Sequence, residues 1–270
     1  MILLEMLSYP FLVRAFLVGV LVSLCAALLG TSLVLKRYSM IGDGLSHVGF
    51  GALAIASALG VAPLAVAVPV VVVAAVLLLR VSQSGRVRGD ATIALISSGA
   101  LAVGVLVISL TSGVNTNVSN YMFGSILTIS SSDAVLSVIL CAAVLVVFTL
   151  FYPRIFAVTF DETFARATGT KAEGYNMLLA ILTAITVVLG MRMMGALLIS
   201  SLIIFPALSA MRVFRSFRSV TVCSAVLSVV CFTLGMTLSY ALETPSGASV
   251  VAVNIIAFAL FALAGRLLRR

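Results

Sequence analysis

The sequence predicts an all-α, polytopic membrane protein with about eight or nine transmembrane helices, some of them short or broken. Hydrophobic residues make up 63% of the 270 residues, charged residues make up only 9%, and the mean hydropathy is +1.31. A soluble domain of this size needs far more charge on its water-facing surface. The apolar residues also form unbroken blocks, such as 66–79 and 135–150, whereas a membrane β-barrel needs a period of two. We therefore treat residues 1–270 as a single transmembrane domain.

Nine segments are long and apolar enough to approach the length that crosses a bilayer of about 30 Å. They lie at 11–35, 44–60, 62–79, 91–111, 134–152, 174–190, 195–211, 219–240 and 248–265. Segment 44–60 is short and glycine-rich, so an eight-span arrangement in which it is re-entrant stays open. The stretch 190–195 fits either a tight hairpin or one long broken helix. No charged leader with a cleavage site opens the chain, so we expect 11–35 to be a retained span.

The basic residues test this count, because Lys and Arg accumulate on the cytoplasmic side of membrane proteins. With nine crossings and a cytoplasmic C-terminus, only Arg14 and Arg192 of the sixteen basic residues fall outside. The fourteen on the inner side are Lys36, Arg37, Arg80, Arg86, Arg88, Arg154, Arg166, Lys171, Arg212, Arg215, Arg218, Arg266, Arg269 and Arg270. Contact with the lipid bilayer and its anionic headgroups accounts for the net charge of +8. Aromatic residues are not interleaved with the basic ones, so we expect no nucleic-acid binding.

Two connecting segments carry more information than simple loops. In 152–173, Asp161 and Glu162 precede Arg166, an order that favours a helix N-terminus, and we expect a short cytoplasmic helix that ends at Gly169. In 199–218, Pro206 removes a backbone hydrogen bond from an apolar helix. We expect a break there, followed by small residues and an arginine cluster that suit docking of a cytoplasmic partner.

Asp43 and His47 are the most informative ionisable residues, and His47 is the only histidine in the chain. An ionisable side chain in lipid costs about 2.5–3.5 kcal/mol on insertion scales, so it usually faces a cavity, a partner or a pathway. Residues i and i+4 share one helix face, which would let the carboxylate and the imidazole hold one divalent metal ion. The alternative is structural: Asp43 caps a helix that starts at Gly44, and His47 bonds a backbone carbonyl.

Counting of spans places Asp43 near the inner face, whereas a pathway site is expected deeper in the membrane. A glycine-rich segment that lines a cavity would reconcile the two. At the predicted outer turn 243–247, Glu243 is a candidate for an external entrance, with a solvated loop carboxylate as the alternative.

Several functions lack the residues they need. No phosphate loop of the form Gly-x-x-x-x-Gly-Lys-Ser/Thr is present, so any nucleotide site lies on another polypeptide. One histidine cannot supply a His-Glu-x-x-His metalloprotease motif, and no serine hydrolase motif is found, so we expect no enzyme activity. The cysteines lie inside apolar blocks and are interpreted as small buried hydrophobes; they are Cys25, Cys141, Cys223 and Cys231.

The segment 36–52, Lys-Arg-Tyr-Ser-Met-Ile-Gly-Asp-Gly-Leu-Ser-His-Val-Gly-Phe-Gly-Ala, resembles a signature in the permease subunits of bacterial ABC importers for zinc, manganese and related divalent metals. The stretches 121–127, 160–169, 194–207 and 244–251 are similar to that family in order and spacing. The resemblance spans nearly the whole chain.

This resemblance implies a multi-pass permease of the bacterial inner membrane that pairs with a second permease copy as a homodimer or pseudo-dimer. Its implied partners are cytoplasmic ATPase subunits, which use the ATP, and an extracytoplasmic metal-binding protein. The cargo would be Zn²⁺ or Mn²⁺, with no permanently bound cofactor. The implied metal-pathway residues are Asp43 and His47, and the implied ATPase-coupling segment is 206–218, with Pro206, Ala207, Ser209, Arg212 and Arg215.

Ligand chemistry agrees with this cargo, because carboxylate and imidazole suit Zn²⁺ and Mn²⁺, whereas Cu⁺ would recruit sulfur ligands. One Asp and one His are too few for a closed site, and a dimer would bring two of each to a central axis. Two alternatives stay open. A metal-ion secondary carrier would show inverted repeats and further intramembrane acids, and an importer of metal chelates or cofactors would need a wider pathway without a compact Asp/His pair.

Overall fold

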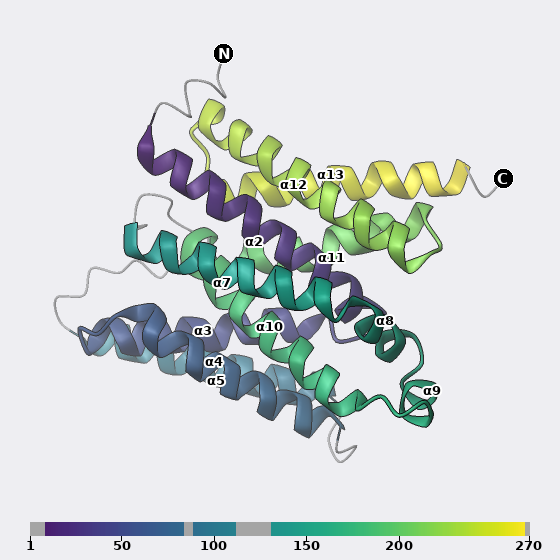
Figure 1. Cartoon of the computed structure of the whole chain (residues 1–270). Coiled ribbons are helices and arrows are strands. Elements are labelled where there is room, and N and C mark those ends of the chain that lie inside the picture. Colours follow the sequence, from purple (N-terminus) through teal and green to yellow (C-terminus); the bar gives the residue numbers. More distant parts are fainter. Residues whose placement is uncertain (1–8, 84–88, 112–130, 268–270) are drawn as a thin grey trace.

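The computed structural model describes residues 9–83, 89–111 and 131–267, and within these ranges the chain forms helices and no strands (Figure 1). The helices are α2 (Pro10–Leu35), α3 (Met40–Ala58), α4 (Pro63–Gln83), α5 (Gly89–Leu110), α7 (Ser131–Leu150), α8 (Tyr152–Phe160), α9 (Glu162–Ala167), α10 (Ala172–Met194), α11 (Ala196–Val213), α12 (Phe217–Leu242) and α13 (Ser246–Leu267). The predicted all-α class is therefore confirmed.

Within the described ranges, eight helices have the length and apolar composition needed to cross a membrane, in agreement with the predicted number. Helix α3, which carries Asp43 and His47, is not among them. It nevertheless runs beside α5 in the same direction, because Gly44 lies against Ile93 and Gly51 lies against the Ala100 carbonyl. The structure thus shows a continuous helix at 40–58 rather than a segment that enters and turns back.

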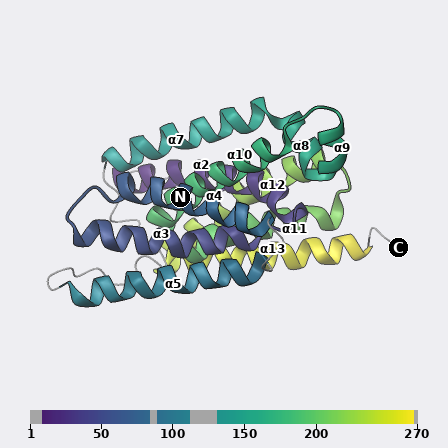
Figure 2. The same ribbon diagram turned by 90° about the horizontal axis from the view of Figure 1, so that it is seen from below.

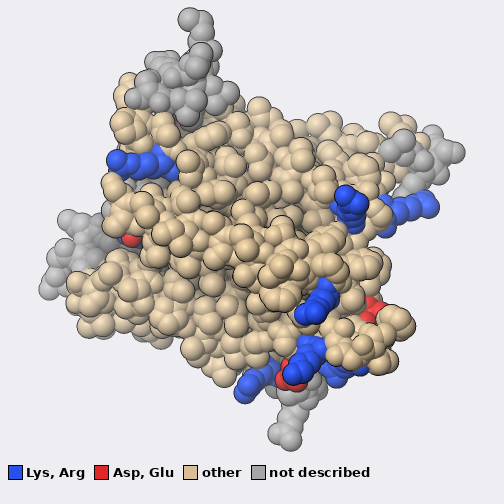
Figure 3. All heavy atoms as spheres, in the orientation of Figure 1, with Lys and Arg blue, Asp and Glu red and all other residues tan. Residues whose placement is uncertain are grey.

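The long helices run roughly along one common axis and alternate in direction along the chain (Figure 2). Helices α8 and α9, the α2–α3 turn, the α11–α12 turn and the C-terminal end of α13 share one end of the bundle, which we call the α8–α9 end. Lys and Arg side chains gather toward this end (Figure 3). Among the basic residues in the described part of the chain, only Arg14 and Arg192 lie toward the opposite end. Arg86, Arg88, Arg269 and Arg270 lie outside the described residues, as does the stretch 121–127.

Helix α10 is the most buried of the eight candidate spans. It ends at Met194, and Gly195 alone links it to α11 with a φ of 90°, a conformation that favours glycine. Gly190 lies against Ile199, so the two helices fold back on each other as a tight hairpin. Because Met194 also lies against Gly19 of α2, the turn is buried within the bundle and does not lie at its end.

Two local expectations need adjustment. Helix α11 continues through Pro206 to Val213, so the expected break at Pro206 is wrong. Neighbouring helices can satisfy the backbone group that a proline frees inside a membrane protein. The segment 152–173 forms two short helices, where we expected one. Asp161 caps the second by accepting a hydrogen bond from the Phe164 amide at 2.9 Å, and Gly169 follows its end with a φ of 84°.

Candidate functional site

Helix α3 begins four residues earlier than the sequence suggested, at Met40, which changes the place of Asp43. Ser39 occupies the N-cap position, and Asp43 lies within the first turn of the helix. Asp43 is therefore not the cap of a helix that starts at Gly44. A carboxylate in the first turn is still favoured by the partial positive charge of the helix N-terminus.

Asp43 and His47 face each other as the i, i+4 spacing predicts, with His47 Nε2 lying 3.7 Å from Asp43 Oδ2. This distance is too long for a strong hydrogen bond. Two ligands on one tetrahedral ion, with bond lengths of about 2.1 Å, are separated by about 3.4 Å. A small side-chain rotation would therefore let one metal ion bridge the pair.

Ser200 of α11 is a third member of this cluster, and it was not assigned a role from the sequence. Its hydroxyl donates a hydrogen bond of 3.2 Å to Asp43 Oδ1, on the carboxylate oxygen that does not face His47. This contact orients the carboxylate and leaves Oδ2 toward the imidazole, as partners of metal ligands commonly do. The two residues are 157 positions apart in sequence, so no local pattern joins them.

The pair lies inside the bundle, some distance from the α8–α9 end. Gly42, next to Asp43, lies against Ile203, and Ile203 also lies against Gly30 of α2. Gly30 precedes the end of α2 at Leu35 by five residues, which corresponds to about 7.5 Å along the helix. His47 is one further helical turn from that end. Asp43 is therefore near the start of its helix and yet packs at the level of an interior turn of α2.

The pair is partly open in the single chain, with 44% of the Asp43 side chain and 23% of the His47 side chain exposed. In the described part of the chain, no group of three or more His, Cys, Asp or Glu residues could hold a metal ion. One chain thus supplies a carboxylate, an imidazole and a positioning hydroxyl, and it leaves one side of the cluster uncovered.

The predicted coupling segment 206–218 divides into a buried part and an exposed part. Pro206, Ala207 and Ser209 are buried within α11, so they cannot form a contact surface on the chain as it stands. Arg212 and Arg215 are exposed at the α8–α9 end.

Helix α8 extends this exposed surface. Phe217, the first residue of α12, packs against Tyr152, Phe156 and Phe160 of α8, with ring centroids between 5.1 and 6.1 Å apart. Phe156, Phe160 and Phe164 are exposed large hydrophobic side chains. Arg212, near the C-terminal end of α11, lies over the Phe258 ring of α13 at 5.4 Å, and Arg215 precedes Phe217 by two residues. We call Phe156, Phe160, Phe164, Arg212 and Arg215 the basic aromatic surface.

At the opposite end, Arg192 lies 3.4 Å from the carboxylate of Asp133 on α7, and Arg14 donates a 2.6 Å hydrogen bond to Ser131. Glu243 is exposed beyond α12, where it adopts a left-handed φ of 53°. Helix α12 runs its full length between this residue and the α8–α9 end. The role of Glu243 at an entrance stays a prediction.

Comparison with known proteins gives one family. The ABC 3 transport family matches residues 8–265. The high-affinity zinc uptake system membrane protein ZnuB of Haemophilus influenzae is 29% identical over 93% of this chain and 97% of the relative. The manganese transport system membrane protein MntC of Halalkalibacterium halodurans is 28% identical over 96% of this chain and 88% of the relative.

A solved structure, PsaBC from Streptococcus pneumoniae in complex with Fab, is similar over the whole fold. Its matching chain has a TM-score of 0.85 and 25% sequence identity, with coverage of 96% of this chain and 95% of that chain. The similarity therefore includes α3 and both ends of the bundle as well as the apolar spans.

Proposed function

Because this chain belongs to the ABC 3 transport family, we propose that it is the transmembrane permease subunit of an ATP-driven importer for a divalent metal ion, Zn²⁺ or Mn²⁺. Relatives named for zinc and for manganese transport match more than nine-tenths of this chain. The observation that carries the proposal is the 3.7 Å approach of the His47 imidazole to the Asp43 carboxylate inside the bundle. Both ligand types suit either ion.

The exposure of this pair supports an assembly of two permease copies. A carboxylate that is 44% exposed on a helix of a membrane protein would be costly where it faces lipid. A second copy related by a two-fold axis would cover the open side and add another Asp43 and His47, giving four ligands. The metal ion is cargo in this arrangement, so a partly open site that binds and releases it serves transport better than a closed cage.

The α8–α9 end suits the ATPase subunits, which would use the ATP. The basic aromatic surface combines exposed phenylalanines with arginines, and aromatic residues and arginine are enriched where proteins bind one another. The distribution of basic residues supports a cytoplasmic position for this end and for the C-terminus in the bacterial inner membrane. A metal-binding protein would then deliver the ion at the opposite, extracytoplasmic end.

Uptake of Zn²⁺ and Mn²⁺ tests the proposal in cells that lack their own importers and carry this chain with its ATPase and binding protein. We expect Asp43→Asn and His47→Ala to abolish energised uptake at matched expression. Asp161→Asn is the control, because it is the same chemical change at an exposed helix cap where Asn also serves well. Undiminished uptake in both site variants would overturn the proposed role of the pair.

The same assay separates the other transport classes. A secondary carrier would move the metal ion without the ATPase subunit, and an importer of chelates would move the complexed metal in preference to the free ion. For this chain we expect uptake to need the ATPase and to favour the free ion.

A further inference from the structure

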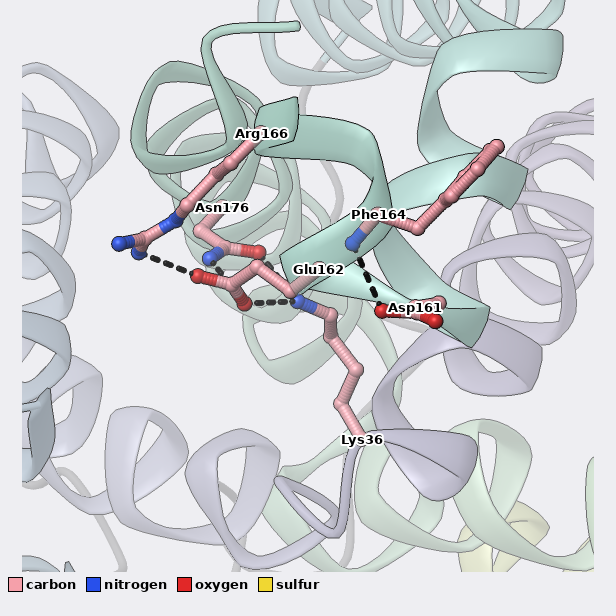
Figure 4. A network of polar contacts seen from close by, with 6 residues as sticks. All are labelled: Lys36, Asp161, Glu162, Phe164, Arg166 and Asn176. Atoms are coloured by element: carbon pink, nitrogen blue, oxygen red, sulfur yellow. Dashed lines mark hydrogen bonds and ion pairs between the residues drawn. The ribbon is translucent and has the colours of Figure 1, made fainter. Parts of the chain in front are cut away.

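The turn between α2 and α3 is fastened to α9 and α10 by one buried lysine. The Lys36 side chain is only 8% exposed, and its Nζ lies 3.2 Å from Glu162 Oε2. The same ammonium group donates a hydrogen bond to Asn176 Oδ1 (Figure 4). Lys36 thus contacts residues that lie 126 and 140 positions away in sequence.

Glu162 is the centre of this arrangement. Its Oε2 accepts hydrogen bonds from Lys36 and from Asn176 Nδ2 at 3.0 Å, and its Oε1 accepts one of 2.6 Å from Arg166. Asn176 is buried; its amide oxygen accepts the hydrogen bond from Lys36, and its amide nitrogen donates the one to Glu162. Lys36, Glu162 and Asn176 therefore form a closed triangle. We call these three residues the Glu162 triangle. Arg166 contacts it from the exposed side.

The charges in the triangle affect each other as expected. Burial lowers the pKa of Lys36, although Glu162 opposes this effect. Burial alone would raise the pKa of Glu162, but hydrogen bonds from Asn176, Arg166 and Lys36 outweigh it and lower the pKa. Buried ion pairs are often no better for stability than well-packed apolar residues of similar volume. Stability alone therefore does not explain the placement of a lysine here.

The Glu162 triangle joins the turn that leads into α3 with the start of α9. On one side, Arg37 follows Lys36 with a left-handed φ of 61°, and the Tyr38 amide bonds the Leu33 carbonyl at 2.8 Å. This tight turn leads directly into α3, so Lys36 precedes Asp43 by only seven residues. On the other side, Glu162 is the first residue of α9, which directly follows α8, and these two helices carry the three phenylalanines of the basic aromatic surface.

We propose that the Glu162 triangle transmits movement of α8 and α9 to α3, with Lys36 as a positioning residue for the Asp43–His47 pair. This inference rests on the proposed function, because it assumes an ATPase at the α8–α9 end and cargo at Asp43. A displacement of α9 pulls on the Lys36 ammonium through the Glu162 contact, while Asn176 of α10 holds both groups in place. The short α2–α3 turn passes the movement to the first turn of α3. Lys36 does not itself touch the ion.

The test uses the complete transporter, with ATPase subunits and binding protein, in proteoliposomes. The number of ATP molecules hydrolysed per Mn²⁺ ion transported is measured for Lys36→Met and for Lys171→Met. Lys36 and Lys171 are the only lysines in the chain, and Lys171 is exposed before α10, so the control is the same substitution at the same end of the molecule. Thermal stability of each purified variant is measured alongside.

We expect Lys36→Met to raise the ATP-to-metal ratio about tenfold, within the range of about 5- to 150-fold that coupling between sites usually carries. Lys171→Met should leave the ratio unchanged. If Lys36→Met does not fold, the ATP-to-metal ratio is measured for Glu162→Gln in its place, because this substitution keeps the side-chain shape and removes the charge. A purely structural role would lower hydrolysis and transport together, so a normal ratio in the folded variant would overturn the inference.

Asp43→Asn, measured in the same membranes, separates this inference from the proposed function. If Asp43→Asn transports Mn²⁺ like the unchanged protein, the proposed metal path is wrong. If Asp43→Asn is inactive while Lys36→Met and Glu162→Gln keep a normal ratio, the metal path stands and the transmission through the Glu162 triangle is wrong.

Discussion

The close approach of α2 and α11 at Gly30 supports the position of Ser200 beside Asp43, and it makes a quantitative prediction. A Cβ atom added at Gly30 would lie 2.0 Å from the carbonyl oxygen of Ile203, where an ordinary contact is 3.4 Å or more. Both groups belong to helix backbones, so no side-chain rotation relieves the overlap. The helices must separate by more than 1 Å, and overpacking of this kind costs about 1–3 kcal/mol.

Gly30→Ala also has an opposing effect, because alanine favours a helix over glycine by up to about 1 kcal/mol. The steric cost is larger, so we expect a net loss of about 1–2 kcal/mol in the free energy of unfolding. Gly174→Ala is the matched control: it lies in the first turn of α10, is exposed, and would bring its Cβ no closer than 4.0 Å to a neighbour. We expect this control to be neutral or stabilising.

The assay is thermal unfolding of both purified variants in one detergent, with Zn²⁺ uptake in cells as a second readout. Separation of α11 from α2 also draws Ser200 away from the Asp43 carboxylate, which it now bonds at 3.2 Å. Uptake should therefore fall in Gly30→Ala at matched expression and stay unchanged in Gly174→Ala. A Gly30→Ala protein as stable as the control would refute the described packing of these two helices.

Three further predictions concern the two ends of the molecule. Arg215→Cys should react with a membrane-impermeant maleimide only from the cytoplasmic side and Glu243→Cys only from the outside; labelling of both from one side would contradict the described topology. Hydrogen bonds from Asn176, Arg166 and Lys36 lower the pKa of Glu162 in the fold from its ordinary value of 4.5, so its carboxylate stabilises the fold above that pH and loses this effect as the pH falls through the folded pKa. The stability difference between the unchanged protein and Glu162→Gln should therefore shrink below pH 4.5, and a difference independent of pH would argue against a charged triangle. Phe164→Ala, at a side chain that is 64% exposed, should weaken binding of the ATPase subunit about thirtyfold, which corresponds to a hot spot of about 2 kcal/mol, with little effect on thermal stability; unchanged binding would show that Phe164 does not contribute to docking.

The sequence predicted the helices well where composition alone decides them. Long apolar blocks and the placement of sixteen basic residues led to the correct class and to helices close to the observed bounds. It failed at Pro206, because a proline inside a membrane protein is accommodated by neighbouring helices that the local sequence does not reveal. It also placed the start of α3 at Gly44 instead of Met40, because glycines and Asp43 resemble a helix boundary.

The candidate site was predictable to the extent that it is local. The approach of Asp43 and His47 follows from helical spacing, whereas the Ser200 contact depends on how α11 packs against α3. The Glu162 triangle shows the same limit. The i, i+4 pair of Glu162 and Arg166 can be recognised in the sequence, but the position of Lys36 beside them depends on the whole fold.

The central claim is that the Asp43–His47 pair binds the transported ion, and one spectroscopic measurement tests it most directly. His47 is the only histidine in the chain, so any histidine nitrogen coupled to bound Mn²⁺ in the purified permease, freed of any histidine tag, must belong to it. Pulsed electron spin-echo spectra should show this nitrogen coupling in the unchanged protein and lose it in His47→Ala. Mn²⁺ bound to the unchanged permease without a histidine nitrogen signal would contradict the account.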